Sequence, residues 1–111
     1  LNDAAVRRRR PMVECAMRGM EATVTTFIPG RTGCLRCYVP EVPPSWKRQF
    51  PVFGAVSGTA ACIGATEVIK LITGIGELLA GVMLSMDLAT MSFRKTRLPR
   101  NPDCACCGCA A

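Results

Sequence analysis

The chain has 111 residues and a mass of 11.9 kDa, which fits one domain and leaves no room for two. Half of its residues are apolar and a fifth are charged, a composition that excludes an intrinsically disordered chain. The formal net charge is +6, and much of the excess lies in the run Arg7–Arg10. A nucleic-acid-binding module needs aromatic platforms or a recognisable reading element beside such a run, and neither is visible. We therefore expect a solvated basic face and no nucleic-acid partner.

The first half of the chain alternates short elements with turn-forming residues. Pro11 stops the first element, and Pro29-Gly30 breaks the third. The long region that follows contains Pro43-Pro44 and has no periodicity, as is usual for functional or disordered loops. In chain order, the patterns predict a helix over 2–10, strands over 12–17 and 22–28, and an irregular region over 31–53.

The clearest helix runs from Thr59 to Thr73 and ends at Gly74. Apart from one narrow stripe of threonines and Lys70, its residues are Ala, Ile, Val, Leu and Gly for the most part. A helix that is apolar nearly all round is expected to be buried. Two further strands are expected over 82–87 and 91–98, before a cysteine-rich tail.

Neither a membrane span nor a secretory signal is expected. The uncharged stretch over residues 51–66 falls short of the roughly 20 residues that span a bilayer. Residues 1–6 lack the basic flank of a signal peptide. We therefore expect a reducing cytoplasm, where paired cysteines are more often metal ligands than disulfides. Cys15 and Cys62 lie in apolar stretches and are expected to be buried.

Two C-x-x-C pairs, Cys34 with Cys37 and Cys104 with Cys107, are separated by the whole middle of the chain. Two residues between ligands let a tight turn present both sulfurs to one ion about 2.3 Å away. Two such turns complete a tetrahedron. In a chain without histidine, this pattern predicts a structural zinc site on these four cysteines.

Other interpretations of the cysteines remain open at this point. Cys106 and Cys109 form a further C-x-x-C in another register of the tail. A disulfide framework is less favoured, because nothing indicates secretion. A redox dithiol is less favoured still, because neither predicted pair opens a helix after a strand.

The residues alone show a zinc staple and no catalytic centre. Gly74-Ile75-Gly76 follows a helix and has Leu79 where a dinucleotide-binding loop needs its third glycine. The absence of histidine removes the commonest general base. Glu67 and Lys70 are interpreted as an ordinary helix pair three residues apart.

Several motifs occur in an order that resembles the second half of the ThiF/MoeB/HesA proteins, relatives of the ubiquitin-activating enzymes. In that family the metal-binding tail reads N-P-x-C-x-x-C-G, and this resemblance selects Cys104 and Cys107 over Cys106 and Cys109. The matching segments are Leu1–Ala4, Pro11–Glu14, Val24–Gly30, Cys34–Cys37, Gly64–Lys70, Asp87–Phe93 and Asn101–Gly108.

The resemblance implies an α/β fold, the C-terminal part of the Rossmann-like activating-enzyme fold. Residues 1–111 would form a single domain with mixed or antiparallel strands, one buried helix and a zinc knuckle. The resemblance also implies a parent adenylyltransferase that uses MgATP on the C-terminal glycine of a ubiquitin-like or sulfur-carrier protein, in a thiamine or molybdopterin type of pathway. The family's ATP-binding and catalytic residues lie upstream of Leu1. None is therefore assigned to this chain, which is expected to be inactive alone.

Within this resemblance, residues 38–53 correspond to the family's crossover loop, and we expect this loop to be mobile without a bound partner. Several relatives carry a cysteine near its end, whereas residues 49–53 read Gln-Phe-Pro-Val-Phe. Adenylation without a covalent cysteine step is therefore favoured. The chain would supply the zinc site, a carrier-facing surface and contacts of a homodimer. The alternative is a stand-alone zinc-stapled interaction module without catalysis.

Overall fold

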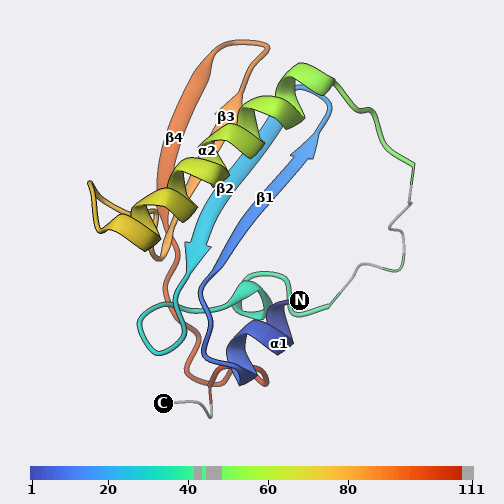
Figure 1. Ribbon diagram of the computed structural model, residues 1–111. Helices are drawn as coiled ribbons and strands as arrows, with labels where there is room; N and C mark the ends of the chain where they lie inside the picture. The colour runs from blue at the N-terminus through green and yellow to red at the C-terminus, as the bar shows by residue number, and fades with distance from the viewer. Residues whose placement is uncertain (42–43, 45–48, 109–111) are drawn as a thin grey trace.

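The computed structural model describes residues 1–41, 44 and 49–108. A four-stranded sheet carries one long helix on one face, and a short helix and the cysteine-bearing turns gather at one end of the sheet (Figure 1). All pairings between the named strands are antiparallel, in the order β1-β2-β3-β4, which confirms the predicted α/β class. The elements are α1 (Asn2–Arg7), β1 (Met12–Arg18), β2 (Glu21–Phe27), η1 (Leu35–Cys37), α2 (Gly54–Thr73), β3 (Val82–Asp87) and β4 (Ser92–Arg97).

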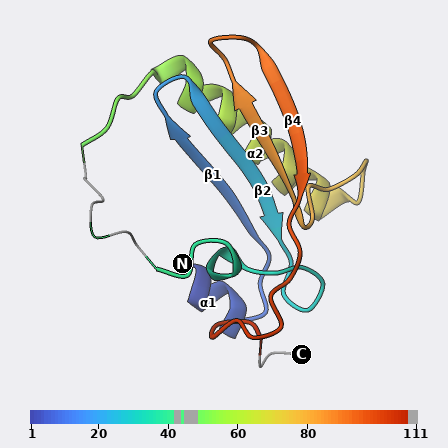
Figure 2. The same cartoon turned by 180° about the vertical axis from the view of Figure 1, so that it is seen from behind.

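The main core lies between α2 and the sheet. Alternate residues of a strand point to the same face, so Ala22 and Val24 of β2 point together toward the helix. Met86 of the neighbouring strand β3 packs beside them. From the helix side, Val56 and Ala60 close the layer, and each is at most 2% exposed. Seen from behind, the strands lie in front of α2 (Figure 2).

The helix α2 begins at Gly54, before the expected start at Thr59, and ends at Gly74 as predicted. Gly74 has a φ of 73°, the left-handed conformation that a glycine adopts without steric cost. The first five residues contain two glycines, which lower helix propensity and hid the start from the sequence pattern. Burial of Val56 against the sheet supplies the stability that the local sequence lacks.

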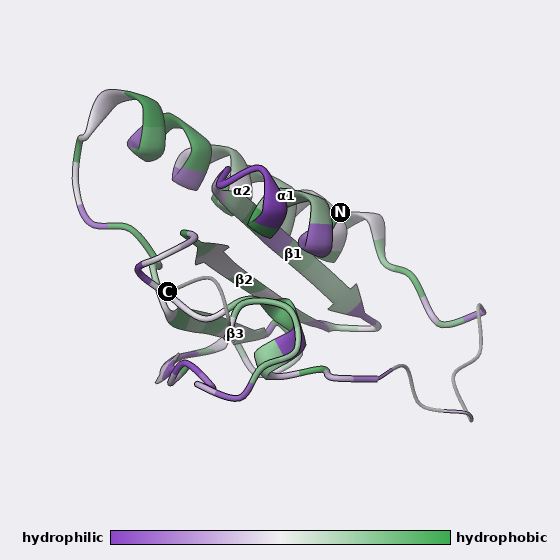
Figure 3. Cartoon of the chain, turned by 90° about the horizontal axis from the view of Figure 1, so that it is seen from below, coloured by the Kyte–Doolittle hydropathy of each residue, from purple (hydrophilic) through white to green (hydrophobic). Residues whose placement is uncertain are grey.

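The expectation that α2 is buried on nearly all sides is wrong for this chain. Its buried residues, Val56, Ala60, Gly64 and Glu67, form one face that packs on β1 and β2. The other side leaves Ile72 78% exposed, together with half-exposed Val68 and Ile69. Four strands offer a single sheet face, which covers one side of a helix. The apolar colouring along α2 is visible in Figure 3.

By length and composition α2 is able to cross a membrane, with 20 residues and a window of mean hydropathy 1.4. The sequence prediction counted only the uncharged stretch 51–66. It missed the full length of the helix, because Glu67 and Lys70 lie inside it. The side chain of Glu67 is bonded to the sheet, however, and one helix face forms the core. We therefore interpret α2 as a packed helix, and the absence of a membrane partner stays a prediction.

Glu67 is a buried acid that ties α2 to the sheet, and not the ordinary surface partner of Lys70 that the spacing predicts. It is 1% exposed. Its Oε2 accepts hydrogen bonds from the Thr26 hydroxyl and the Leu79 amide, each at 2.7 Å, while Oε1 pairs with Lys70. Burial raises the pKa of Glu67, but these hydrogen bonds outweigh it and leave the pKa below its ordinary value. The carboxylate therefore stays charged at neutral pH.

Cys15 and Cys62, predicted to be buried, are both exposed. Cys62 lies on the uncovered side of α2. Cys15 lies on the edge strand β1, where its sulfur is close to the backbone of Gly64: a Cβ added there would stand 2.3 Å from Sγ. The strand and helix thus meet at a position with no room for a side chain on the helix.

The predicted crossover loop, residues 38–53, lies only partly within the described chain. Residues 42–43 and 45–48 are outside it, so the expected mobility of the loop remains a prediction. At its end the loop returns to the sheet: the Gly19 amide donates to the Pro51 carbonyl at 3.0 Å, and Val52 forms a parallel bridge with Gly19.

Candidate metal centre

Two tight turns bring four cysteine sulfurs together beyond the end of the sheet. The Sγ atoms of Cys34, Cys37, Cys104 and Cys107 all lie within 4.8 Å of one another. Sγ of Cys34 is 3.8 Å from that of Cys104, and Sγ of Cys37 is 3.4 Å from that of Cys107. Zinc bonds of about 2.3 Å in a tetrahedron place sulfurs about 3.8 Å apart. These two separations lie close to that value, so the cluster is compatible with one tetrahedral ion.

Backbone hydrogen bonds shape each turn. In the first, the Cys37 amide donates to the Cys34 carbonyl at 3.0 Å, and the Cys34 amide points at Sγ of Cys37 at 3.4 Å. In the second, the Gly108 amide donates to the Cys104 carbonyl at 2.8 Å. A Cβ at Gly108 would lie 2.4 Å from the Pro102 carbonyl oxygen, so only glycine fits there. This crowding explains why a glycine follows the second C-x-x-C.

The pKa values of the two clustered thiols in the second turn, Cys104 and Cys107, shift in opposite directions. Backbone N–H groups, that of Cys107 foremost, hold the pKa of Cys104 below its ordinary value. Burial instead raises the pKa of Cys107 to about 12. A cation bound between them would compensate the buried thiolates and release the remaining protons. The four clustered cysteines could therefore hold a metal ion.

Cys106 belongs to the same turn but not to the cluster. Its Sγ donates to Oδ1 of Asp3 at 3.4 Å and accepts from the Asn2 side-chain amide at 3.5 Å. Burial raises its pKa to about 12, so it remains a protonated thiol. Cys109, its predicted alternative partner, lies outside the described residues. Within the described part, the four clustered cysteines are the ones that the family motif selects.

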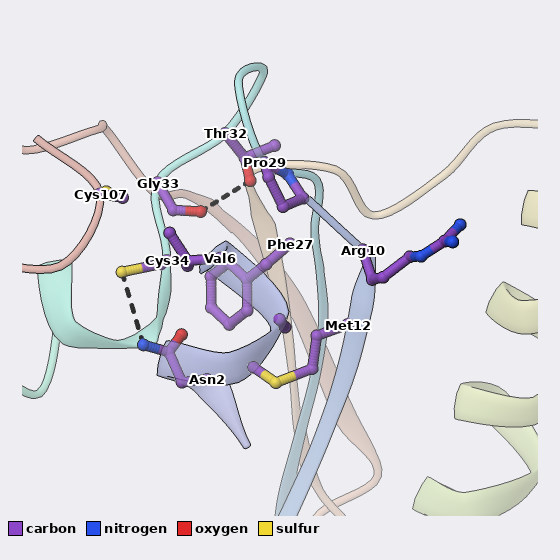
Figure 4. A pocket seen from close by; sticks show the side chains of 11 residues that line it. Asn2, Val6, Arg10, Met12, Phe27, Pro29, Thr32, Gly33, Cys34 and Cys107 are labelled. Carbon is purple, nitrogen blue, oxygen red and sulfur yellow. Dashed lines mark hydrogen bonds between the residues drawn. The ribbon is translucent and has the colours of Figure 1, made fainter. Parts of the chain in front are cut away.

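The short helix α1 fastens the first turn from the side, which the sequence did not predict. Oδ1 of Asn2 accepts from the Leu35 amide at 2.9 Å, and its Nδ2 approaches Sγ of Cys34 at 3.7 Å (Figure 4). Asp3 receives two hydrogen bonds from Arg36, at 2.8 and 2.9 Å, which hold the pKa of Asp3 well below its usual range. The available signal was the Leu1–Ala4 motif, but no residue type in it indicates a contact with a turn so distant in sequence.

An apolar layer lies between the cysteine cluster and the sheet. Val6, Met12 and Phe27 lie around a cavity of about 10 Å³, which is about enough for one water molecule, and the side chain of Arg10 points away (Figure 4). Phe27 is 3% exposed and stacks on Tyr38 with ring centroids 6.0 Å apart. These contacts join the turns to the sheet, so the cysteines sit on a packed base.

This fold and cysteine cluster match a known group of proteins. Residues 1–106 match the model of the ThiF family, and the chain belongs to that family. It is 55% identical over 108 residues to Protein HesA of Leptolyngbya boryana, covering 97% of this chain and 39% of that protein. It is 35% identical over 113 residues to the adenylyltransferase and sulfurtransferase MOCS3 of Sus scrofa, covering 97% of this chain and 25% of that protein. The predicted resemblance is confirmed.

Solved structures agree with this assignment. The crystal structure of E. coli MccB with MccA-N7isoASN superposes with a TM-score of 0.81 at 25% sequence identity. The match covers 96% of this chain and 35% of MccB. The chain thus spans less than half the length of these relatives.

Proposed function

We propose that this chain is the C-terminal half of an ATP-dependent adenylyltransferase that activates the C-terminus of a ubiquitin-like or sulfur-carrier protein in the cytoplasm. The observation that carries this proposal is family membership over residues 1–106, together with a relative that is named an adenylyltransferase and sulfurtransferase. The crystal structure of E. coli MccB with a form of MccA supports a peptide or protein as the substrate. The chain's own part is structural: a metal knuckle, a carrier-facing surface and dimer contacts.

The metal in this proposal is zinc. Four thiolates in a tetrahedral arrangement favour a soft, tetrahedral ion over magnesium or calcium, which prefer oxygen ligands. A site with four protein ligands leaves no open position for substrate, so the ion would act as a structural staple. It would hold the tail containing Cys104 and Cys107 against the turn containing Cys34 and Cys37.

The proposed chemistry is adenylation without a covalent cysteine in the loop before α2. Residues 49–53 contain no cysteine, and Cys15 and Cys62 lie on strand β1 and helix α2, away from that loop. In the family's longer proteins, MgATP is bound by residues of the half that precedes the part matched here. This chain would position the carrier, while that half supplies the phosphate chemistry.

An exchange assay tests the proposed function. The longer protein, with its ATP-binding half, is incubated with ATP, labelled pyrophosphate and a candidate carrier. We expect carrier-dependent ATP–pyrophosphate exchange that disappears when the C-terminal glycine of the carrier is deleted. The present chain alone should show none. Lack of exchange by the longer protein with every sulfur-carrier or ubiquitin-like partner of its host would instead favour the zinc-stapled interaction module.

We predict that this chain self-associates through the uncovered side of α2. Val68, Ile69 and Ile72 expose an apolar surface of a kind that monomers usually cover. Burying about 800 Å² per partner is typical of stable complexes, and two-fold dimers are the commonest arrangement. Light scattering after size exclusion should give about twice the 11.9 kDa mass of one chain. A monomeric mass at micromolar concentration, or an Ile72→Glu variant that still dimerises, would contradict this interface.

We also predict that Asn2 slows metal loss. Asn2→Ala removes the acceptor of the Leu35 amide and the N–H group near Sγ of Cys34. Groups that orient metal ligands commonly contribute about 10-fold or more to metal affinity. Zinc transfer to a chromogenic chelator should accelerate by about that factor at unchanged stoichiometry. Arg8→Ala, an exposed change at the end of α1, is the control; equal rates in the two variants would refute a role for Asn2.

A further inference from the structure

A groove beside the cysteine cluster, with none of the four clustered cysteines in its lining, lies between the loop after β2 and the segment that leaves β4. Its volume is about 560 Å³, within the range of ligand-binding clefts. The loop and the departing segment lie side by side in both views of the ribbon (Figures 1 and 2). Three stretches of chain form the lining: residues 31–33, 80–82 and 97–100.

Arginine is the only charged residue type in this lining. Arg31 comes from the first of these stretches, and Arg97 and Arg100 come from the third. The three arginines border one hollow, with no aspartate or glutamate among the described lining residues. The two ion pairs of the described chain, Asp3–Arg36 and Glu67–Lys70, involve other basic residues. Positive charge of one sign in a concave site raises the local concentration of anions. The groove therefore has the charge of an anion-binding site.

The backbone around the groove is fixed by hydrogen bonds. The Thr32 amide donates to the Ile28 carbonyl at 2.9 Å, which closes the turn that carries Arg31. The Leu98 amide donates to the Gly81 carbonyl at 2.8 Å, which holds the end of β4 beside Arg97.

For Arg100, the structure fixes the side chain itself. Nη2 of Arg100 donates to the Cys107 carbonyl at 2.8 Å, so the guanidinium is anchored to the second cysteine turn. A guanidinium has five N–H donors, and one such bond leaves the others able to bind oxygen atoms. The fixed backbone at Arg31 and Arg97 and the anchored side chain of Arg100 reduce the entropy lost on binding. This favours a specific site over a diffuse basic surface.

We propose that this groove binds a ligand with closely spaced oxyanions, either phosphates or carboxylates, at Arg31, Arg97 and Arg100. The planar fork of arginine matches both groups, because each presents two oxygens to two parallel N–H donors. A single small anion would leave most of 560 Å³ empty, so the ligand is a polyphosphate or an acidic segment of several residues. This site goes beyond the proposed adenylation and does not depend on it.

The test is a titration of the full chain followed by backbone amide NMR, at constant ionic strength. One arm uses inorganic pyrophosphate, the other a tri-glutamate peptide, and sodium chloride is the blank. We expect saturable shifts of the Gly33, Gly81 and Leu98 amides in at least one arm. The arm that saturates at lower concentration identifies the source of the oxyanion.

Matched variants decide between a site and general basicity. Arg97→Gln and, on another segment, Arg31→Gln should each raise the dissociation constant about tenfold or more, as expected for a lost charge-assisted hydrogen bond. Arg94→Gln removes the same charge from the same exposed strand β4 but outside the groove, and should change it less than twofold. Equal weakening by all three variants, or the absence of saturable shifts in both arms, would overturn the proposal. The proposal would also be overturned if, in a longer protein, carboxylates from the rest of the chain filled the groove and abolished binding.

Discussion

Replacing Cys104 with serine is expected to abolish stoichiometric zinc binding. It is also expected to unfold the end of the molecule where the two cysteine turns meet. A serine hydroxyl is a poor zinc ligand, and three thiolates cannot close the tetrahedron. Structural zinc contributes on the order of 10 kcal/mol to folding, more than the whole stability of many small domains. Metal analysis and thermal unfolding of the purified variant, each compared with the wild type, give the two readouts.

Cys106→Ser is the matched control for this prediction. It lies two residues further along the same turn, but its sulfur bonds to Asp3 and Asn2 and lies outside the four-sulfur cluster. We expect full zinc content and a small change in melting temperature. Should Cys106→Ser lose zinc while Cys104→Ser retains it, the other register of the tail would be the correct one.

Glu67→Ala is expected to lower the free energy of unfolding by about 3 kcal/mol, since it leaves two buried donors without an acceptor. These are the Thr26 hydroxyl and the Leu79 amide, both bonded to Oε2 at 2.7 Å. Chemical denaturation measures the loss. Glu67→Gln keeps one acceptor oxygen and should lose less, and Glu77→Ala, at an exposed position, should change little. If all three variants had equal stability, the buried network would contribute nothing.

The same carboxylate gives an expected pH dependence. Hydrogen bonding leaves the pKa of Glu67 in the folded chain below its ordinary value of 4.5. The stabilisation is therefore fully present above about pH 4.5 and is lost as the pH falls through the lower, folded-state pKa. The stability difference between the wild type and Glu67→Gln should shrink in acid over that interval. A difference that stays constant down to pH 3 would contradict this assignment.

The sequence predicted the elements of the sheet well, because strand runs and turn residues are local signals. The bounds of β3 matched at 82–87, and Gly74 ended α2 as expected. The start of α2 and its one-sided burial were missed, since both depend on tertiary packing. Val56 stabilises a glycine-containing first turn, and the sheet covers only one side of the helix.

The site shows the same division between local and distant information. The C-x-x-C spacing and the family motif identified the four clustered cysteines, because ligand spacing within each turn is local. The support given by Asn2 and Asp3 was missed, since it joins the chain's second and third residues to the turn at Leu35–Cys37. Glu67 was misjudged for a related reason: an i,i+3 spacing to Lys70 does not reveal that the sheet buries the carboxylate.

Native mass spectrometry of the chain, purified without chelator in reducing buffer, tests the proposed metal centre most directly. The measurement reports the bound metal, its stoichiometry and the number of protons displaced in one experiment. We predict one zinc per chain, and a mass that shows loss of the protons of the bound cysteines, as thiolate ligation requires. A chain that remains metal-free with all thiols protonated after incubation with zinc would contradict the proposed site.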